Sequence, residues 1–304
     1  MSQRHTQNKT ISSQTPWALA SRPQRCVTIG EHIRLGHDAP LVIIAGPCAL
    51  ESLSHARMMA EKLCHITDTH GVRLIFKSSF DKANRSKYHA NRGIGMEKGL
   101  VILDALRKEF QCPVITDVHE AHQCADVAKI ADIIQIPAFL CRQTDLLCAA
   151  AETGNVINVK KGQFLAPWDM AHVVDKISAC GNERILVTER GSSFGYNMLV
   201  NDMRSLPLLG RLGYPVVFDA THSVQLPGGA VGEGQSGGHR QFIAPLARAA
   251  VAVGIAALFV EVHDTPDKAP SDGANMLTLT QLDNLLTPLK QIDTFIKHKT
   301  QDTA

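Results

Sequence analysis

Short apolar segments alternate with amphipathic segments along most of the chain. Eight runs rich in aliphatic and β-branched residues begin about thirty residues apart and are followed by polar loops: 42–45, 74–76, 114–116, 133–136, 156–159, 185–188, 216–218 and 257–260. The segments between them place apolar residues at helical spacing, as at Ala56, Met59 and Leu63. Near-continuous apolar strands are typical of parallel sheets covered by helices. Eight strand–helix units therefore predict a (β/α)8 barrel.

The ends of this predicted barrel carry their own signals. Residues 26–29 and 32–35 flank a Gly-Glu pair and predict a short β-hairpin before the first barrel strand. Pro288 lies within the last helical segment, where we expect it to bend or break the helix. The alternative fold is an open doubly wound sheet, although no GxGxxG motif follows the first predicted strand.

The first 25 residues differ in composition from the rest of the chain. They are polar, lack acidic residues and are rich in Ser, Thr and Gln. We expect a disordered tail over 1–25, with an organelle transit peptide as the alternative, ahead of a single barrel domain over 26–298.

Composition and charge argue against several classes of partner. The net charge of +2 arises from four basic residues that precede the first acidic residue, Glu31, and beyond them 27 basic side chains stand against 29 acidic ones. With aromatic residues at only 5%, we expect no binding to nucleic acid or to an anionic membrane. No run approaches the roughly 18 apolar residues of a membrane span. Eight scattered cysteines without a CxxC pair indicate free, mostly buried thiols and a cytoplasmic location.

Polar side chains follow every predicted strand, at the end where barrel enzymes place their chemistry. These positions carry charged, amide or thiol groups: Cys48; Lys77, Ser79 and Lys82; Asp117 and His119; Gln135; Asn158, Lys160 and Lys161; Glu189 and Arg190; Asp219 and His222; Glu261 and His263. A single such residue is usually a solvated loop residue. Their occurrence at all eight ends predicts one functional site.

Two kinds of chemistry can be assembled from this ring. A cationic set suits the phosphate and carboxylate oxygens of a small, multiply charged substrate: Lys77, Lys82, Arg85, Lys160 and Arg190. A second set offers one thiol, one imidazole and two carboxylates, which could bind Zn²⁺, Fe²⁺ or Mn²⁺: Cys48, His222, Glu261 and Asp272. The spacing of this second set is not a metal signature, and Cys48 read alone could be a small buried thiol.

A glycine-rich segment lies between the seventh and eighth predicted strands. Residues 226–240 contain six glycines, at 228, 229, 232, 234, 237 and 238. This composition predicts a mobile loop over the barrel mouth, with a plain flexible connection as the alternative.

Ordered motifs run through these strand ends. The most distinctive is KSSFDKANRS at 77–86, and the others are TDVHE at 116–120, QIPAF at 135–139, RQTD at 142–145, NVKK at 158–161, Arg190, FGY at 194–196, FDATH at 218–222 and SGG at 236–238. Together they resemble the family of 3-deoxy-D-manno-octulosonate 8-phosphate synthases, in order, over roughly residues 26–298.

The resemblance implies a (β/α)8 barrel, usually a homotetramer, that condenses phosphoenolpyruvate with D-arabinose 5-phosphate and water. The products are 3-deoxy-D-manno-octulosonate 8-phosphate and inorganic phosphate, a step towards lipopolysaccharide. In the family chemistry, carbon 3 of phosphoenolpyruvate attacks the open-chain aldehyde and water adds at carbon 2. The resulting intermediate then loses phosphate by breaking its carbon–oxygen bond.

The resemblance also implies roles for individual residues. Those matching the phosphoenolpyruvate site are Lys77, Ser79 and Lys82 for the carboxylate, and the Ala138 backbone, Lys160 and Arg190 for the phosphate. Those matching the arabinose 5-phosphate site are Asn84, Arg85 and Ser86, with Arg142 expected from a neighbouring subunit. Asp117, His119 and Gln135 match positions between the two substrates. The residues expected to act in catalysis are Lys160, Asp117, His222 and Cys48.

One position separates the two branches of the family that the chain resembles. The metal-independent branch has asparagine where this chain has Cys48, and the metal-dependent branch has cysteine with ligands matching His222, Glu261 and Asp272. The resemblance therefore implies a divalent transition metal, Zn, Fe or Mn. Two departures, Ile94 and Asp264, stand where proline is common, and both lie at loop positions.

Three other functions remain open. The sister enzyme makes 3-deoxy-D-arabino-heptulosonate 7-phosphate from erythrose 4-phosphate, but it usually has Lys-Pro-Arg-Thr-Ser where this chain has KANRS at 82–86. A Schiff-base aldolase using Lys160 would form an adduct that borohydride traps. A non-catalytic sugar-phosphate-binding protein would release no phosphate.

Overall fold

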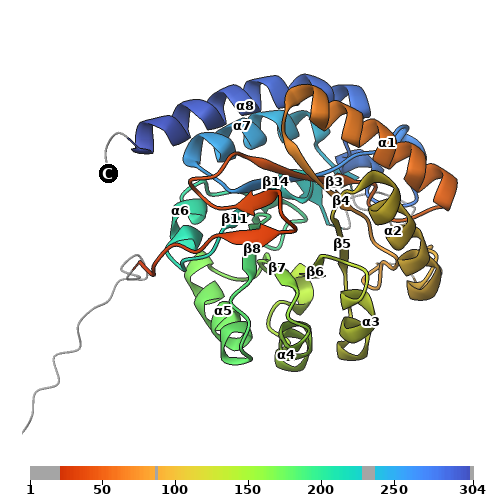
Figure 1. Cartoon of the computed structure of the whole chain (residues 1–304), viewed down its shortest axis with the longest axis horizontal. Coiled ribbons are helices and arrows are strands. Elements are labelled where there is room, and N and C mark those ends of the chain that lie inside the picture. The colour runs from red at the N-terminus through yellow and green to blue at the C-terminus, as the bar shows by residue number, and fades with distance from the viewer. Residues whose placement is uncertain (1–20, 86–87, 228–236, 302–304) are drawn as a thin grey trace, which may run out of the picture.

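The computed structural model describes residues 21–85, 88–227 and 237–301, and these form a closed barrel ringed by helices (Figure 1). Each barrel strand runs parallel to its neighbours, in the order β3-β4-β5-β6-β7-β8-β11-β14, and β14 closes onto β3. The barrel strands are β3 (Val42–Gly46), β4 (Arg73–Lys77), β5 (Val114–Asp117), β6 (Ile133–Ile136), β7 (Val156–Lys160), β8 (Ile185–Glu189), β11 (Val216–Asp219) and β14 (Ala257–Glu261). The predicted (β/α)8 barrel is confirmed.

Six of these strands extend one residue beyond the predicted apolar run, and the added residue is charged: Lys77, Asp117, Lys160, Glu189, Asp219 and Glu261. Each of these residues is paired with a neighbouring strand, as Lys77 is with Ile115 and Glu261 with Gly46. The charged side chains are therefore held by the strand ladder rather than by loops.

Alternating residues of the strands point into the barrel. An apolar cluster fills the barrel interior towards the N-terminal ends of the strands, which is called the lower end below. Ile75, Ile115 and Ile133 are among its fully buried members. Two residues further along the same three strands stand Lys77, Asp117 and Gln135, which are also buried. Because side chains repeat every two residues along a strand, the polar layer lies directly above the apolar one.

Eight helices cover the outside of the barrel in the described part of the chain (Figure 1). They are α1 (Leu53–His70), α2 (Met96–Phe110), α3 (Cys124–Ala128), α4 (Thr144–Glu152), α5 (Met170–Ala179), α6 (Ser205–Gly210), α7 (Ile243–Val253) and α8 (Leu279–Gln301). The larger hydrophobic core lies between these helices and the outward faces of the strands.

The expected break at Pro288 is wrong, because α8 is continuous through it. Leu282, Leu285, Leu286 and Leu289 are buried on the face of α8 that packs against α1 and α7. Proline removes one backbone hydrogen bond from the helix. Burial of this leucine face on both sides of Pro288 offsets that loss.

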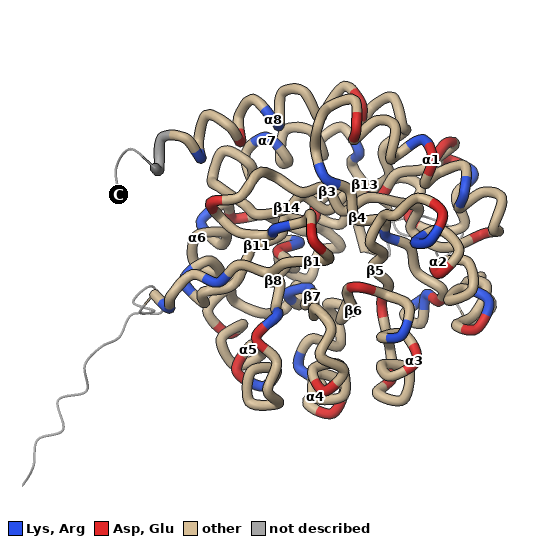
Figure 2. Tube along the Cα trace, viewed as in Figure 1, with Lys and Arg blue, Asp and Glu red and all other residues tan. Residues whose placement is uncertain are grey.

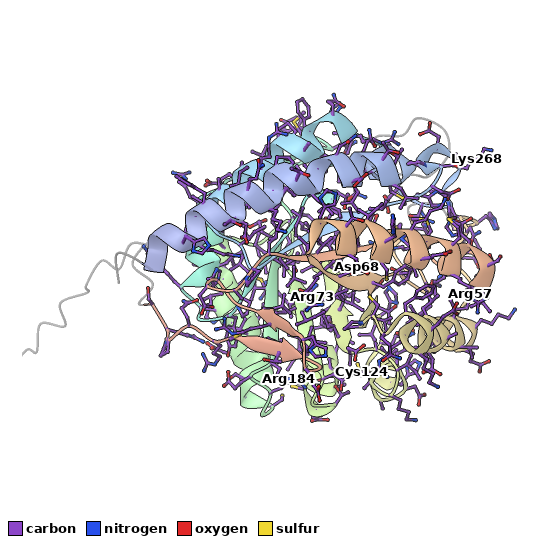
Figure 3. All side chains as sticks on the ribbon, turned by 45° about the horizontal axis from the view of Figure 1, so that its top comes forward. Arg57, Asp68, Arg73, Cys124, Arg184 and Lys268 are labelled. Atoms are coloured by element: carbon purple, nitrogen blue, oxygen red, sulfur yellow. The ribbon has the colours of Figure 1, made fainter. Side chains whose placement is uncertain are left out.

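The predicted hairpin is confirmed as β1 (Val27–Ile29) paired with β2 (Ile33–Leu35). Its apolar side chains belong to the same cluster that fills the lower barrel interior, so the hairpin closes that end. Arg184 fixes it in place by donating to the Thr28 carbonyl at 3.1 Å, and its side chain lies beside the hairpin in Figure 3. Just before the hairpin, Arg22 forms an ion pair with Asp175 on α5.

Short elements in the loops complete the described fold. Small antiparallel pairs join β9 (Ser192–Ser193) to β10 (Leu199–Val200) and β12 (Gln225–Leu226) to β13 (Gly237–Gly238). The 3-10 turns are η1 (Ala121–Gln123), η2 (Ala138–Leu140), η3 (Pro167–Asp169), η4 (His222–Val224), η5 (Arg240–Phe242), η6 (Pro266–Lys268) and η7 (Gly273–Asn275). The loop expected from the glycine-rich segment falls mainly on residues 228–236, outside the described residues, as does Ser86.

Acidic and basic residues are interspersed around the helix ring (Figure 2). No helix among the described residues is long and apolar enough to span a membrane. All eight cysteines are free thiols, and four of them are buried.

Candidate active site

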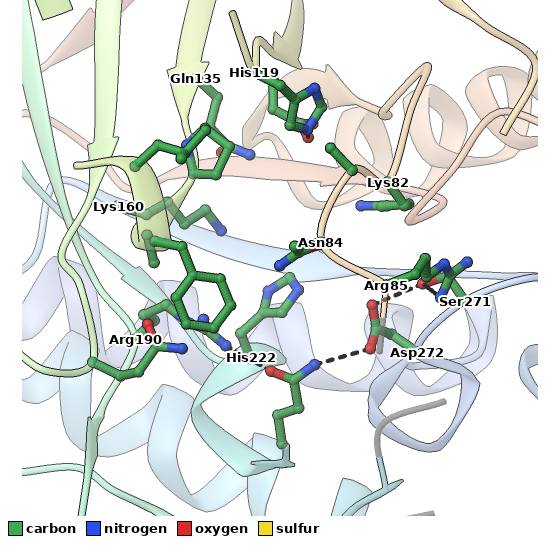
Figure 4. Close-up of a pocket in the computed structure, with 18 of the residues that line it drawn as sticks. Lys82, Asn84, Arg85, His119, Gln135, Lys160, Arg190, His222, Ser271 and Asp272 are labelled. Carbon is green, nitrogen blue, oxygen red and sulfur yellow. Dashed lines mark hydrogen bonds and ion pairs between the residues drawn. The ribbon is translucent and has the colours of Figure 1, made fainter. Parts of the chain in front are cut away.

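A cavity of about 460 Å³ opens at the C-terminal end of the barrel. Its lining brings together residues from most of the strand ends: Lys77, Lys82, Asn84, Arg85, Asp117, His119, Gln135, Ala138, Lys160, Arg190, His222, Gln225, Ser271 and Asp272. Lys160 and Arg190 lie on one side, Arg85, Ser271 and Asp272 lie on the opposite side, and His222 lies between them (Figure 4). One cavity thus has two walls with separate sets of cationic groups.

The floor of the cavity contains two lysines that meet at one hydroxyl. Lys77 Nζ donates to Ser79 Oγ at 3.0 Å, and Lys82 Nζ donates to the same oxygen at 2.9 Å. Ser79 in turn donates to the Asp117 carboxylate, which lies 3.3 Å from His119 Nε2. Burial alone would raise the pKa of Asp117, but the Lys82 charge and the His119 hydrogen bond hold it well below its usual range. Two ammonium groups next to an ionised carboxylate suit a substrate carboxylate.

Lys160 ends β7 and points into the cavity from the layer above the apolar interior. Its ammonium pairs with the Asp219 carboxylate and lies 3.2 Å from the centroid of the Phe259 ring. Burial lowers the pKa of Lys160 to about 8, against the opposing effect of the Asp219 charge. Lys160 is therefore mostly protonated at neutral pH, but its charge is easily lost at alkaline pH.

Asp219 connects this lysine to His222. The Asp219 Oδ2 atom lies 2.7 Å from His222 Nδ1, and Asp219 Oδ1 accepts from the His222 backbone N–H at 2.9 Å. Burial alone would raise the pKa of Asp219, but His222 and Lys160 hold it well below its usual range. A carboxylate on Nδ1 fixes the imidazole and leaves Nε2 facing Glu261 Oε1 at 3.7 Å.

Arg190 follows β8 and is linked across the cavity by Gln225. Its guanidinium donates to Gln225 Oε1 at 2.7 Å, and Gln225 Nε2 donates to Asp272 Oδ1 at 2.9 Å. The Glu189 carboxylate accepts from the Arg190 backbone N–H at 2.9 Å and so orients the start of this loop. The backbone of Ala138, on η2, lines the same side of the cavity. These groups suit a phosphate dianion.

Arg85 lies at the opposite wall. It donates to Ser271 Oγ at 2.8 Å and to the Pro270 carbonyl at 2.9 Å, and Asn84 lies beside it in the lining. Arg142, by contrast, is exposed after η2 and does not belong to the lining of the cavity. Apart from Arg142, the residues expected to contact substrate line this one cavity, with two exceptions. Ser86 lies outside the described residues, and Ser79 lies just beneath the lining.

A candidate metal-binding group includes Asp272, on the same side of the cavity as Arg85. Three ligand atoms, one each from Cys48, Glu261 and Asp272, lie within 4.8 Å of one another. The Cys48 thiol donates to Asp272 Oδ2 at 3.3 Å. The Glu261 Oε2 atom is buried and has no hydrogen-bond partner among the described residues. Burial and the negative charges of Glu261 and Asp272 raise the pKa of the Cys48 thiol. A bound cation would reverse that shift, so this donor set fits a transition-metal ion.

The backbone at the end of β3 explains how Cys48 reaches this group. A Cβ atom at Gly46 would lie 2.0 Å from the Lys77 carbonyl oxygen, so only glycine allows β3 and β4 to approach here. The chain then turns at Pro47, and the buried Cys48 faces Asp272. His222 lies outside the three-residue group, next to Glu261.

Three residues make contacts in the site for which the motifs implied no role. Asp219 contacts both Lys160 and His222, and its position at a strand end was the signal available in the sequence. Gln225, in β12, and Ser271, which directly precedes Asp272, each donate to the Asp272 carboxylate, and no sequence pattern marks either of them.

Comparisons with known proteins agree over nearly the whole chain. Residues 17–298 match the model of the DAHP synthetase I family. A 2-dehydro-3-deoxyphosphooctonate aldolase from Brucella anthropi is 58% identical over 271 residues, covering 89% of this chain and 97% of the relative. Proteins of the same name from Brucella ovis and Brucella melitensis are 57% identical over 266 residues, covering 88% of this chain and 95% of each relative.

Proposed function

Because this chain belongs to the DAHP synthetase I family and, within it, to the 2-dehydro-3-deoxyphosphooctonate aldolases, we propose that it condenses phosphoenolpyruvate with D-arabinose 5-phosphate and water. The products are 3-deoxy-D-manno-octulosonate 8-phosphate and inorganic phosphate, a step towards lipopolysaccharide. The observation that carries this proposal is a single cavity lined by Lys77, Lys82, Lys160, Arg190 and Arg85. Lys160 and Arg190 lie on the side of this cavity that faces Arg85 (Figure 4).

Phosphoenolpyruvate occupies the deeper part of the cavity. Its carboxylate binds between Lys77 and Lys82, whose ammonium groups already meet at Ser79 Oγ. Its phosphate binds Lys160, Arg190 and the Ala138 backbone. Two charged ends fixed in this way hold carbon 3 in one orientation, and such positioning contributes on the order of 7–11 kcal/mol in well-oriented systems.

Arabinose 5-phosphate occupies the outer part, with its phosphate on Arg85 and Asn84. The Arg85 guanidinium is held at the cavity wall by Ser271 and the Pro270 carbonyl, so it meets the sugar phosphate in a fixed orientation. The aldehyde then lies between the two phosphate sites, beside the residues in the middle of the cavity: Asp117, His119 and Gln135.

Two groups in the cavity, His119 and Lys160, are proposed to accept or hold protons during the reaction. His119 Nε2 faces the ionised Asp117, while its buried Nδ1 atom has no hydrogen-bond partner in the described part of the chain. Turned by a rotation of the ring into the cavity that His119 lines, this nitrogen would accept the proton of the water that adds at carbon 2. Lys160 Nζ holds its proton against the phosphate and stabilises the charge that develops as the carbon–oxygen bond breaks.

We also propose that this chain depends on a metal ion, as the cysteine branch of the family does. Cys48, His222, Glu261 and Asp272 would hold a zinc, iron or manganese ion, and the bound ion supplies a Lewis acid at the wall of the cavity. The residues themselves keep Asp272 ionised. Burial alone would raise the pKa of Asp272, but His222 and Lys82 lower it to about 2.

Phosphate release with two competing sugars tests the reaction. We expect release from phosphoenolpyruvate with arabinose 5-phosphate and little or none with erythrose 4-phosphate. The reverse preference would identify the sister enzyme, and no release with either sugar would indicate a binding protein. Treatment with borohydride in the presence of substrate should leave Lys160 unmodified, because the proposed reaction forms no Schiff base.

Metal removal tests the proposed metal dependence separately from the reaction. A strong chelator should abolish turnover, and a transition metal should restore it. Cys48→Asn should bind metal more weakly and retain some activity after chelation, while Cys48→Ala, which offers neither thiolate nor amide, should do worse. Full activity in protein shown by elemental analysis to be metal-free would overturn the dependence.

We also propose a cytoplasmic homotetramer in which Arg142 completes a neighbouring site. Its exposed position outside its own cavity supports this assembly. Mixed tetramers provide the test: Arg142→Ala and Lys160→Met chains are each expected to be inactive, and their co-assembly should restore activity in sites that combine one intact residue from each chain. Sedimentation as a monomer would contradict the assembly.

A further inference from the structure

A second group of metal-ligand side chains lies outside the catalytic cavity, where α1 begins. Glu51 precedes the cap residue of α1 and His55 lies in its first turn, where Ser52 caps the helix by accepting from the His55 backbone N–H at 3.1 Å. His263 lies two residues beyond β14, which pairs with β3 in the closed barrel. Barrel closure thus brings these three side chains together although 208 positions separate His55 from His263.

The ligand atoms of this group converge. One oxygen of Glu51 and one ring nitrogen of each histidine lie within 4.8 Å of one another. The Glu51 Oε1 atom is 2.7 Å from His263 Nε2 and 3.6 Å from His55 Nδ1. Ligands of one tetrahedral ion lie roughly 3.3 Å apart, given metal–nitrogen distances of about 2.0–2.1 Å. Small side-chain rotations are enough to reach that geometry.

Two further observations distinguish this group from an ordinary ion pair. His55 Nδ1 is buried and makes no hydrogen bond to any described residue, although Glu51 Oε1 lies 3.6 Å away. A single oxygen, Asp264 Oδ1, lies 3.0 Å from His55 Nε2 and 3.2 Å from His263 Nδ1. A carboxylate on the far nitrogen of a ligating histidine is the usual arrangement behind metal sites. Here one carboxylate serves both rings, and Asp264 is one of the chain's two departures from the family pattern.

The group is accessible from solvent on one side. The side chain of His263 is 5% exposed and that of His55 15%, but Glu51 is 35% exposed. Glu51 also lines a second cavity, of about 270 Å³, which it shares with Arg85 and Pro270. An ion can therefore enter without crossing the catalytic cavity.

We propose that Glu51, His55 and His263 form a second binding site for a divalent transition-metal ion that takes imidazole and carboxylate ligands, such as Zn²⁺ or Co²⁺. The Thr265 backbone N–H donates to His263 Nδ1 at 2.9 Å, so Nε2 carries the proton shared with Glu51. When His263 Nε2 binds a metal, the proton must be on Nδ1 instead. Nδ1 then donates a hydrogen bond to Asp264, and the hydrogen bond from the Thr265 N–H is lost. This cost makes the second site weaker than a site with a thiolate ligand.

Counting metal equivalents tests the proposal without using activity. Metal-stripped wild-type protein and two variants, His55→Gln and His65→Gln, are titrated with Zn²⁺ by calorimetry and analysed for bound zinc. His65 is an exposed histidine on the same helix, away from the group, and serves as the matched control. We expect His55→Gln to bind one equivalent fewer per chain than wild type, and His65→Gln to match wild type. Equal stoichiometry in wild type and His55→Gln would overturn the proposal.

Cobalt absorption separates the two sites. A Cys48 centre gives thiolate-to-cobalt charge transfer, whereas the imidazole–carboxylate site gives only ligand-field bands. We expect His55→Gln to lose the second component and keep the first. If His55→Gln does not fold, Asp264→Asn removes only the carboxylate behind the rings and should weaken the second equivalent by about 10–100-fold. An unchanged second equivalent in Asp264→Asn would also contradict the site, and the outcome is independent of whether Cys48 binds metal.

Discussion

The two ends of the barrel are built by the same eight strands but have opposite interiors. At the lower end, Ile75 and Ile115 pack with the hairpin residues Ile29 and Leu35 in a dry apolar cluster. At the upper end, two residues further along these strands, Lys77 and Asp117 lie buried among other charges. Apolar burial at the lower end stabilises the fold without any specific pairing. The upper end holds charges that are costly to bury and that keep one another in place. We therefore expect mutations at the upper end to affect mainly activity and mutations at the lower end to affect mainly stability.

The largest expected effect comes from removing a charge at the upper end. Lys160→Met keeps the side-chain length but removes the ammonium group placed against the phosphate. We expect kcat/KM to fall by about 10³-fold, the size of loss seen when a preorganised charge-stabilising donor is removed. Asp219 keeps its contacts to His222 and Thr221, so the free energy of unfolding should change by only ~1 kcal/mol.

Steady-state kinetics and urea unfolding of Lys160→Met measure the two quantities. Lys98→Met, at an exposed position on α2, is the matched control and should leave both unchanged. Wild-type affinity for phosphoenolpyruvate in Lys160→Met, measured by calorimetry, would contradict the role of this lysine.

The next effect belongs to the lower end. Ile29→Ala removes buried methyl groups from the hairpin that closes the barrel. We expect the free energy of unfolding to fall by about 3 kcal/mol through lost burial and a residual cavity, which is roughly a 10²-fold change in the folding equilibrium. Under conditions where the protein stays folded, kcat/KM should remain within about twofold of wild type. A selective loss of activity in Ile29→Ala would show that the two ends are coupled.

The same contrast explains which features the sequence could predict. The lower end depends on apolar burial, so strands such as Val42–Gly46 could be located from their continuous apolar runs and the hairpin from its flanking apolar residues. Lys160 and Arg85 could be proposed because strand ends and motifs mark them. The role of Asp219 at the junction of Lys160 and His222 could not, because it depends on which side chains the closed barrel places face to face. Gln225 is a similar case, since its two contacts come from elements 35 and 47 residues away.

A smaller effect is expected at the outer wall. Arg85→Ala removes the guanidinium proposed to bind the sugar phosphate, and it also frees Ser271 and the Pro270 carbonyl. We expect KM for arabinose 5-phosphate to rise by about 10–100-fold, the loss of one charge-assisted contact, with KM for phosphoenolpyruvate nearly unchanged. Initial-rate kinetics with each substrate varied in turn separate the two constants. An equal rise in both would mean that Arg85 supports the cavity as a whole, and unchanged kinetics would remove it from the site.

The smallest effect is a pH dependence that arises only at the upper end. Burial lowers the pKa of Lys160 from its ordinary value of 10.5 to about 8. The ammonium form that binds phosphate is therefore dominant below pH 8 and is lost as the pH rises through 8. Phosphoenolpyruvate affinity should fall by up to about tenfold per pH unit above that value, while bound substrate holds the proton and shifts the kcat profile to higher pH. Stability has the opposite sign: burial disfavours the charged lysine in the folded state, so this residue's contribution to folding becomes more favourable between pH 8 and 10.5. Calorimetric titration of phosphoenolpyruvate from pH 6.5 to 9.5, with Lys160→Met as the reference, measures this contribution. A binding constant that stays flat across pH 8 in wild type, or falls equally in Lys160→Met, would show that another group controls the pH dependence.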